Sequence, residues 1–312
     1  MYKQITICLV AIDVDDTTFY LDRALLSVVS IYKYIDSKIK ITVYTNNTNK
    51  FSHKLVQIYK KELNRISPLL NIVDISDFGD FIAPKQIKIK GIIDTLENSK
   101  DESITVFIDV DLICIGNWHK TLQKLLYQSK VDIMACIELN SLEVSSYPNI
   151  NSGFVIIKKN TINTKIVNRW LESFEFCIKN SINPRLEHDQ PHFRRALSEF
   201  MPNLICLPKE YNFRGHEAQI FTDWAWGDVF GVHNNLIFSQ FSELLMDSKI
   251  GAKNSKFFIE KKIDELEFFC NKKSKKINTP RLINFYFFKK NIFISTVVFL
   301  VSIARHIFRR LR

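Results

Sequence analysis

The stretch ITVFIDVD, residues 104–111, decides the fold of this chain. It begins as an apolar, β-branched run, which is typical of a strand buried on both faces, and it ends with Asp109 and Asp111 two residues apart. Side chains alternate along an extended chain, so both carboxylates point to the same side where the strand ends. Paired carboxylates suit Mg²⁺ or Mn²⁺ shared with substrate phosphates, although the pattern alone is also common in solvated loops.

Strand-like and helix-like segments alternate before this stretch. Continuous apolar runs predict strands, and helical spacing of apolar residues predicts the helices between them. The predicted order is strand 5–12, helix 21–35, strand 39–45, helix 53–63, strand 71–75, helix 85–97 and strand 103–108. This order predicts an α/β fold with a mostly parallel sheet, helices on both faces, and ligands at the carboxyl ends of the strands.

The pattern continues beyond Asp111 with less regularity. The predicted elements there are helix 118–129, strand 133–137, strand 153–158, helix 163–179 and a helix that opens at Pro191. From residue 249 the composition becomes charged and then apolar. We therefore expect a catalytic domain at 1–248 and a basic, partly apolar helical tail at 249–312.

The composition favours a packed core in a reducing compartment. Of the 312 residues, 46% are apolar and 12% aromatic, which is ample for a core. The six cysteines are widely spread and form no CxxC pair, and the first residues lack the pattern of a secretory signal. A cytoplasmic enzyme is the simplest interpretation.

The formal charge of +10 is concentrated in the tail. Residues 249–312 hold 16 Lys and Arg against 4 Asp and Glu, which leaves 27 against 29 for residues 1–248. A nucleic-acid binder would carry its basic stripe on the folded domain, so we expect no nucleic-acid partner.

The last part of the tail contains an uncharged apolar stretch at 292–304 with basic residues on both sides. It is too short for a comfortable membrane span. The pattern favours a helix lying in the anionic cytoplasmic surface of a membrane, which would make the protein peripheral. The alternative is a helix packed on the protein or on a partner.

Six short segments carry a resemblance to a known family. The sequence is similar, over about residues 5–235, to the retaining family 8 and related GT-A glycosyltransferases. The segments, in order, are FIDVD at 107–111, ACIE at 135–138, INSGFVIIKK at 150–159, HDQPHF at 188–193, LPKEYNFRG at 207–215 and GVHNN at 231–235. The resemblance implies a GT-A fold and transfer of a sugar, with retention, from a nucleotide-diphosphate sugar such as a UDP-sugar to a glycan or lipid-linked acceptor.

The resemblance also assigns roles to individual residues. It makes Asp109, Asp111 and His233 the ligands of Mn²⁺ or Mg²⁺, with the two aspartates also facing the donor diphosphate. Without the other motifs, His233 would be an ordinary core histidine. A glycine, a lysine and a Pro-Trp pair usually follow this histidine and clamp the diphosphate in the family, whereas this chain reads HNNLIFSQFSELL.

Other matching positions would contact the donor or act beside the reacting carbon. The resemblance places Asp189 and Gln190 near the anomeric carbon, and the remaining donor contacts at Asp13, Phe19, Lys85, Lys88, Glu138, Asn151 and Gly153. Each has a plainer alternative. Asp189 and Gln190 could only cap a helix, the NSG triplet could be an ordinary turn, and the lysines could be solvated.

A second enzyme class competes at the N-terminus. The stretch LVAIDVDDT, residues 9–17, also resembles haloacid-dehalogenase-like phosphatases, in which Asp13 would be the nucleophile and Asp15 the general acid. This alternative leaves the segments at 188–193, 207–215 and 231–235 without a role.

Overall fold

The structure is a computed structural model, and it describes most of the segments that carry motifs. The described residues are 4–13, 19–34, 39–59, 63–119, 122, 130–137, 150–212, 230–233 and 251–267. Four predictions fall wholly or mostly outside them: the donor contact at Glu138, the alternative acid Asp15, the helix 118–129, and the apolar stretch of the tail.

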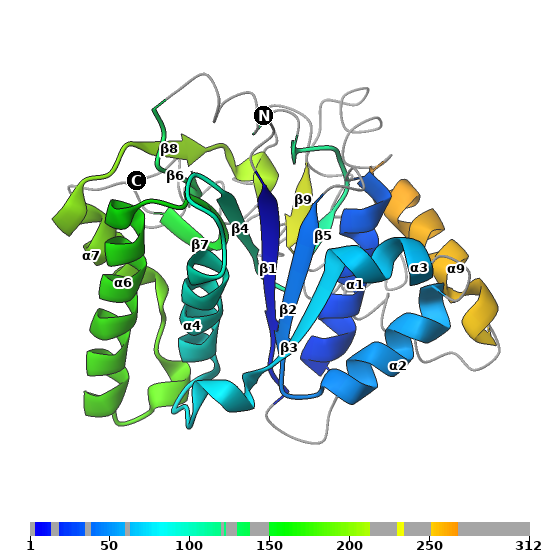
Figure 1. The fold of residues 1–312 in the computed structure, drawn as a ribbon, viewed down its shortest axis with the longest axis horizontal. Coiled ribbons are helices and arrows are strands. Elements are labelled where there is room, and N and C mark those ends of the chain that lie inside the picture. The colour runs from blue at the N-terminus through cyan, green and yellow to red at the C-terminus, as the bar shows by residue number, and fades with distance from the viewer. Residues whose placement is uncertain are drawn as a thin grey trace, which may run out of the picture.

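A seven-stranded sheet forms the centre of the molecule (Figure 1). Its strand order is β3-β2-β1-β4-β7-β6-β8. The strands are β1 (Ile5–Ala11), β2 (Lys40–Thr45), β3 (Leu70–Asp74), β4 (Ile104–Ile108), β6 (Ile133–Ile137), β7 (Ile150–Lys158) and β8 (Leu204–Leu207). Only β7 runs antiparallel to its neighbours, so the prediction of a mostly parallel sheet is confirmed.

Two short strands form a separate pair beside the large sheet. Strand β5 (Leu112–Cys114) follows β4 almost directly and pairs antiparallel with β9 (Gly231–His233). The sequence analysis predicted neither of them, nor β8, because runs of three or four residues are too short to show a period.

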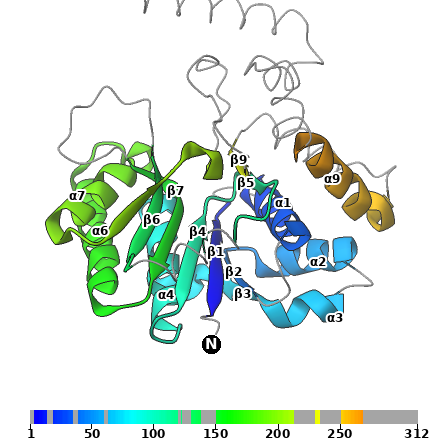
Figure 2. The same cartoon turned by 90° about the horizontal axis from the view of Figure 1, so that it is seen from above.

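Helices cover both faces of the sheet, as Figures 1 and 2 show. On one face lie α1 (Phe19–Tyr34), α2 (Thr48–Tyr59) and α9 (Gly251–Glu267), with the one-turn helix α3 (Leu63–Ile66) close by. On the other lie α4 (Pro84–Glu97), α6 (Thr161–Asn180) and α7 (Gln190–Phe200). Two clusters of buried apolar side chains fill the space, one on each side of the sheet.

Helix α9 packs on α1 and α2 through three buried side chains of one face, Ile259, Ile263 and Leu266. Polar contacts flank this face, since the Tyr34 hydroxyl donates to Glu267 at 2.7 Å and the Lys33 ammonium lies 2.8 Å from Asp264. The described part of the segment 249–312 thus shares a core with the rest of the chain, while the domain boundary at 248 stays a prediction.

None of the helices that the structure describes has the length and apolar composition needed to cross a membrane.

Candidate active site

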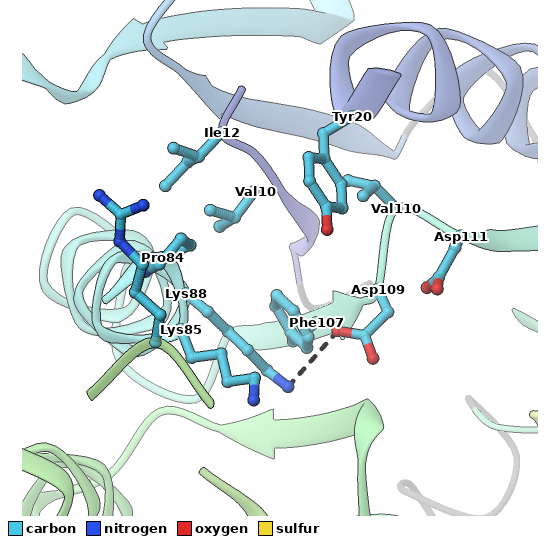
Figure 3. Close-up of a pocket in the computed structure, with 11 residues that line it drawn as sticks. Val10, Ile12, Tyr20, Pro84, Lys85, Lys88, Phe107, Asp109, Val110 and Asp111 are labelled. Atoms are coloured by element: carbon cyan, nitrogen blue, oxygen red, sulfur yellow. Dashed lines mark ion pairs between the residues drawn. The ribbon is translucent and has the colours of Figure 1, made fainter. Parts of the chain in front are cut away.

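A cleft opens where strands β1 and β4 end and helix α4 begins. Its volume is about 280 Å³, and Figure 3 shows the side chains that line it. The lining residues are Val10, Ile12, Tyr20, Pro84, Lys85, Lys88, Phe107, Asp109, Val110, Asp111 and Arg185. Ligands bind at the carboxyl ends of strands in sheets of this kind, so the cleft lies where the sequence predicted it.

The two aspartates of ITVFIDVD are held by their backbone. Asp109 donates its backbone N–H to the Gly153 carbonyl oxygen at 2.8 Å, which ties the end of β4 to β7. The buried Ser27 hydroxyl of α1 lies 2.8 Å from the carbonyl oxygens of Val110 and Leu112. These contacts fix the turn between the two carboxylates, so their direction does not depend on side-chain packing alone.

Strand pairing brings His233 to the aspartates. Because β5 and β9 are antiparallel with Leu112 opposite His233, the imidazole lies beside the residue that precedes Leu112. His233 Nε2 is 2.9 Å from Asp111 Oδ2. One ligand atom from each of Asp109, Asp111 and His233 lies within 4.8 Å of the others, so the structure brings the three predicted metal ligands together.

The two aspartates differ in their electrostatic surroundings. Burial raises the pKa of the Asp111 carboxyl, but the His233 ring and the Arg23 guanidinium, 3.6 Å away, outweigh burial and hold this pKa at about 2. Burial is the stronger influence on Asp109, whose pKa is raised although Lys88 opposes the change. The Asp111 carboxylate is therefore anionic over the physiological pH range.

The donor set fits a divalent cation. Two carboxylates and one imidazole supply oxygen and nitrogen ligands, with negative charge to balance the ion. Imidazole is a common ligand of Mn²⁺ and a less usual one of Mg²⁺. The residues present therefore fit the predicted ion, with Mn²⁺ the better match.

Lys88 lies between Asp109, one of the three predicted metal ligands, and Asp189. Its ammonium group is 3.4 Å from Asp109 Oδ1 and 3.1 Å from Asp189 Oδ2, and its side chain is 10% exposed. Burial alone would lower the pKa of Lys88, but the two carboxylates outweigh it and raise this pKa. Figure 3 shows the ammonium group directed at Asp109, so Lys88 is not a solvated surface lysine.

Asp189 is the residue just before α7, yet its carboxylate does not cap that helix. It accepts instead from the Ser152 hydroxyl at 2.9 Å and from Lys88. The Trp170 ring nitrogen donates to its backbone carbonyl at 2.9 Å. Burial would raise the pKa of Asp189, but Lys88 and Ser152 outweigh burial and lower it. Asp189 therefore occupies the N-cap position of α7 without using its side chain to cap the helix.

The NSG triplet forms a distortion in the pairing of β7 rather than a plain turn. The register between β6 and β7 shifts there, since Cys136 pairs with Asn151 whereas Ala135 pairs with Val155. Such bulges redirect side chains, and they are common beside active sites. At Gly153, a Cβ atom would stand only 2.4 Å from Asp109 Oδ2 and 2.9 Å from Asn151 Oδ1, so any other residue would displace these two side chains.

Asn151 connects several predicted site residues. Its Oδ1 accepts from the Gly153 backbone N–H at 2.7 Å, and its Nδ2 donates to Gln190 Oε1 at 3.3 Å. Asn151 and Gln190, which the sequence placed near the donor sugar and the reacting carbon, are therefore in direct contact.

Three of the predicted donor contacts, Asp13, Phe19 and Lys85, lie in different surroundings. The buried Asp13 carboxylate accepts from the Tyr20 backbone N–H at 2.7 Å, at the start of α1. Tyr20 lines the cleft, whereas Phe19 lies under the Arg23 guanidinium, 3.8 Å from its ring centre. Lys85 lines the cleft and donates to the Glu187 carbonyl oxygen at 2.5 Å. The donor-contact roles of Asp13 and Phe19 stay predictions.

Nothing in this arrangement favours the phosphatase alternative. Asp13 is 5% exposed, and its carboxylate accepts a hydrogen bond from the first turn of α1. The nucleophile of a phosphatase must instead be able to reach a phosphorus atom. Asp15, its partner in that alternative, lies outside the described residues.

Sequence reasoning did not assign four side chains that complete the site: Tyr20, Arg23, Arg185 and Asn212. Asn212 had a signal, because it belongs to the matching segment LPKEYNFRG. Nothing local marks Arg23 or Arg185, since their roles arise from contacts between distant parts of the chain.

Comparison with known proteins gives the fold. No protein-family model matches the sequence, and no curated protein is similar to it. Among solved structures, the galactosyltransferase LgtC in complex with donor and acceptor sugar analogues is 12% identical, with 74% of this chain and 87% of that chain covered and a TM-score of 0.51.

Two further solved structures are similar to a lesser degree. Mouse xyloside xylosyltransferase 1 is 10% identical, with 74% of this chain and 98% of that chain covered and a TM-score of 0.48. The glycosyltransferase GlyE of Streptococcus pneumoniae is 15% identical, with 74% and 55% covered and a TM-score of 0.47. The likeness to LgtC confirms that this chain has the GT-A fold that its sequence motifs predicted.

Proposed function

We propose that this protein is a metal-dependent glycosyltransferase that moves a sugar from a nucleotide-diphosphate sugar, most simply a UDP-sugar, to a glycan or lipid-linked acceptor. The observation that carries the proposal is the convergence of Asp109, Asp111 and His233, of which the two aspartates line the cleft. Beside this group, the buried ion pair of Lys88 with Asp189 adds a second polar centre.

In this proposal Asp109, Asp111 and His233 hold Mn²⁺ or Mg²⁺. When bound, the ion neutralises the charge that develops on the departing diphosphate. Lys85 and Arg185 line the same cleft and add positive charge beside the phosphates. Their position supports a diphosphate ligand even though the usual sequence of the family's clamp is missing after His233.

The donor sugar would lie against β7 and the start of α7. Asn151 is nearly buried there, and the absence of a side chain at Gly153 makes room for the Asp109 and Asn151 side chains beside it. Asp189, held anionic by Lys88 and Ser152, would accept hydrogen bonds from sugar hydroxyls. Gln190 follows it and would lie near the anomeric carbon, which agrees with a retaining reaction. Glu138 keeps its expected role as a further sugar contact.

The test is donor hydrolysis by wild type and by Asp111→Ala on a panel of UDP- and GDP-sugars, with and without Mn²⁺. Removing a metal ligand should lower the rate at least about 100-fold, because the ion supplies several kcal/mol of charge stabilisation. Asp101→Ala is the matched control, since Asp101 is exposed and precedes the amino end of β4, whereas the cleft lies at the carboxyl end of that strand.

Two results would contradict the proposal. Hydrolysis that is equally fast without a divalent ion excludes the metal-dependent mechanism. An Asp111→Ala variant as active as the Asp101→Ala control excludes the assigned site.

A further inference from the structure

Asn212 bridges the metal group and the donor-sugar residues. It follows the short helix η4 (Lys209–Tyr211) and is 6% exposed. Its Nδ2 lies 2.7 Å from Asn151 Oδ1, and its Oδ1 lies 3.1 Å from His233 Nδ1. One buried amide therefore contacts both a predicted metal ligand and a predicted sugar contact.

The direction of each hydrogen bond in this bridge follows from one donor. The Gly153 backbone N–H can only donate, so the Asn151 atom 2.7 Å from it is the amide oxygen. Asn212 must then present its NH₂ group to that oxygen, which leaves its own oxygen facing His233. Since an amide oxygen can only accept, His233 Nδ1 carries the hydrogen.

The direction of this bridge matters for the metal group. With the hydrogen on Nδ1, Nε2 is the ring nitrogen that remains for a metal ion, and it lies 2.9 Å from Asp111 Oδ2, another of the predicted ligand atoms. Metal-binding histidines usually donate their other ring N–H to an acceptor that fixes the tautomer and the ring orientation. Asn212 occupies that place here.

The bridge also continues on the other side. Asn151 uses its NH₂ group to donate to Gln190 Oε1 at 3.3 Å. The hydrogen bonds therefore run in one direction from His233 through Asn212 and Asn151 to Gln190.

We propose that Asn212 is a positioning residue that fixes the metal-binding tautomer of His233 and, through Asn151, the orientation of the Gln190 amide. The inference rests on the proposed function, because it assigns the partner of a proposed metal ligand. It predicts that the two ends of the bridge can be disturbed separately.

Two substitutions distinguish the contact of Asn212 with His233 from its contact with Asn151. Asn212→Leu removes both hydrogen bonds at similar volume. Asn212→Asp keeps an acceptor for His233 Nδ1 but loses the donor for Asn151 Oδ1. Asn71→Leu is the control, because Asn71 is exposed on β3. Circular dichroism and the melting temperature show whether each variant is folded.

The first measurement is the affinity for Mn²⁺ alone, by electron paramagnetic resonance titration of the full chain. We expect Asn212→Leu to bind Mn²⁺ about 10–100-fold more weakly than wild type, as for other lost partners of metal-binding histidines. Asn212→Asp should bind within about threefold of wild type, because its carboxylate still accepts from Nδ1.

The second measurement is donor hydrolysis with the UDP-sugar that wild type hydrolyses fastest. Asn212→Asp should lower kcat/KM about 10-fold at saturating Mn²⁺, because Asn151 Oδ1 loses a buried donor. A purely structural role for Asn212 would instead change Mn²⁺ affinity and kcat/KM together in both variants.

Whether Nδ1 carries a hydrogen is read from long-range ¹H–¹⁵N spectra of metal-free protein, with His233→Asn used to assign the signal. Wild type should show a hydrogen on Nδ1. An Nδ1 without a hydrogen, or equal Mn²⁺ affinity in wild type and Asn212→Leu, overturns the inference alone. Wild type that binds no Mn²⁺ overturns the metal site of the proposed function and the inference with it.

Discussion

Buried charges at the centre of the site depend on one another. Lys88 lies close to Asp109 and Asp189; the Lys88 and Asp189 side chains are buried, and the Asp109 side chain is 25% exposed. Removing one member of a buried pair leaves an uncompensated charge, which costs more than the pair itself contributes. The site is therefore expected to be sensitive to the protonation of its carboxylates.

Asp189→Asn tests this dependence on pH. The pKa of Asp189 in the folded protein is lowered, so its ionisation stabilises the fold above its unfolded pKa of about 3.9 and this stability is lost as the pH falls below it. We expect the variant to be less stable than wild type by about 3 kcal/mol at pH 6, since Lys88 keeps Asp109 as a partner. The difference should narrow below about pH 4, as measured by urea unfolding in the presence of a chelator. A difference that does not change between pH 6 and pH 3 would contradict the assignment.

Gly153→Ala tests the close approach of Asp109 to β7. The new Cβ atom would stand 2.4 Å from Asp109 Oδ2, so the carboxylate must move. Mn²⁺ affinity should fall at least about 10-fold in a metal titration, because ligand geometry governs metal binding. Gly79→Ala is the control: that glycine has a φ of 69°, so alanine is strained there, but no site residue is near its Cβ position. Equal losses of affinity in both variants would point to general destabilisation.

At the scale of elements, two local irregularities build the site. The distortion in β7 turns Asn151 and Ser152 toward α7, and the β5–β9 pair brings His233 beside Asp111. Gly231 allows this pairing, because a Cβ atom there would be 2.5 Å from the Tyr211 carbonyl oxygen. The regular strands of the large sheet fix the position of the site, and these two irregularities bring its polar side chains together.

Helix α9 gives a second prediction at this scale. Ile263 of α9 is 1% exposed in the same apolar cluster as α1 and α2. Ile263→Ala should lower the free energy of unfolding by about 2–5 kcal/mol, the usual cost of such a truncation in a core. Phe257→Ala, at a position of the same helix that is 64% exposed, should change it by less than about 0.5 kcal/mol. If both variants unfold like wild type, α9 contributes nothing to the stability of the domain.

At the scale of the whole molecule, charge is separated along the sequence. Residues 1–248 are close to neutral, and the excess of Lys and Arg lies in 249–312. We propose that the tail holds the enzyme at the anionic cytoplasmic face of a membrane, which would suit a lipid-linked acceptor.

Flotation with liposomes tests this proposal. The full chain should float with vesicles that contain anionic lipid, and binding should weaken as salt is raised, because about 1 kcal/mol per basic residue comes from the surface potential. A chain that ends at residue 280 should stay in the dense fraction. Equal flotation of the two chains would rule out the tail as the attachment.

The sequence by itself determined the alternation of strands and helices and the position of the paired aspartates. Both features can be recognised in a contiguous stretch, because the period of two in strands and of about 3.6 in helices appears in the pattern of neighbouring residues. The bounds of β1, β2 and α4 agree with the prediction to within a residue or so. The motif order also singled out His233, Asn151 and Asp189, which in the structure contact Asp111, Gln190 and Lys88 respectively.

Only the tertiary structure decided how those residues act on one another. That Lys88 pairs with Asp189, that Arg23 faces Asp111, and that Asn212 contacts His233 follow from strand order, a bulge and the packing of α1 and α4. These contacts join segments far apart in the chain. Their geometry depends on the register of several strands at once, and no local pattern in the sequence encodes that register.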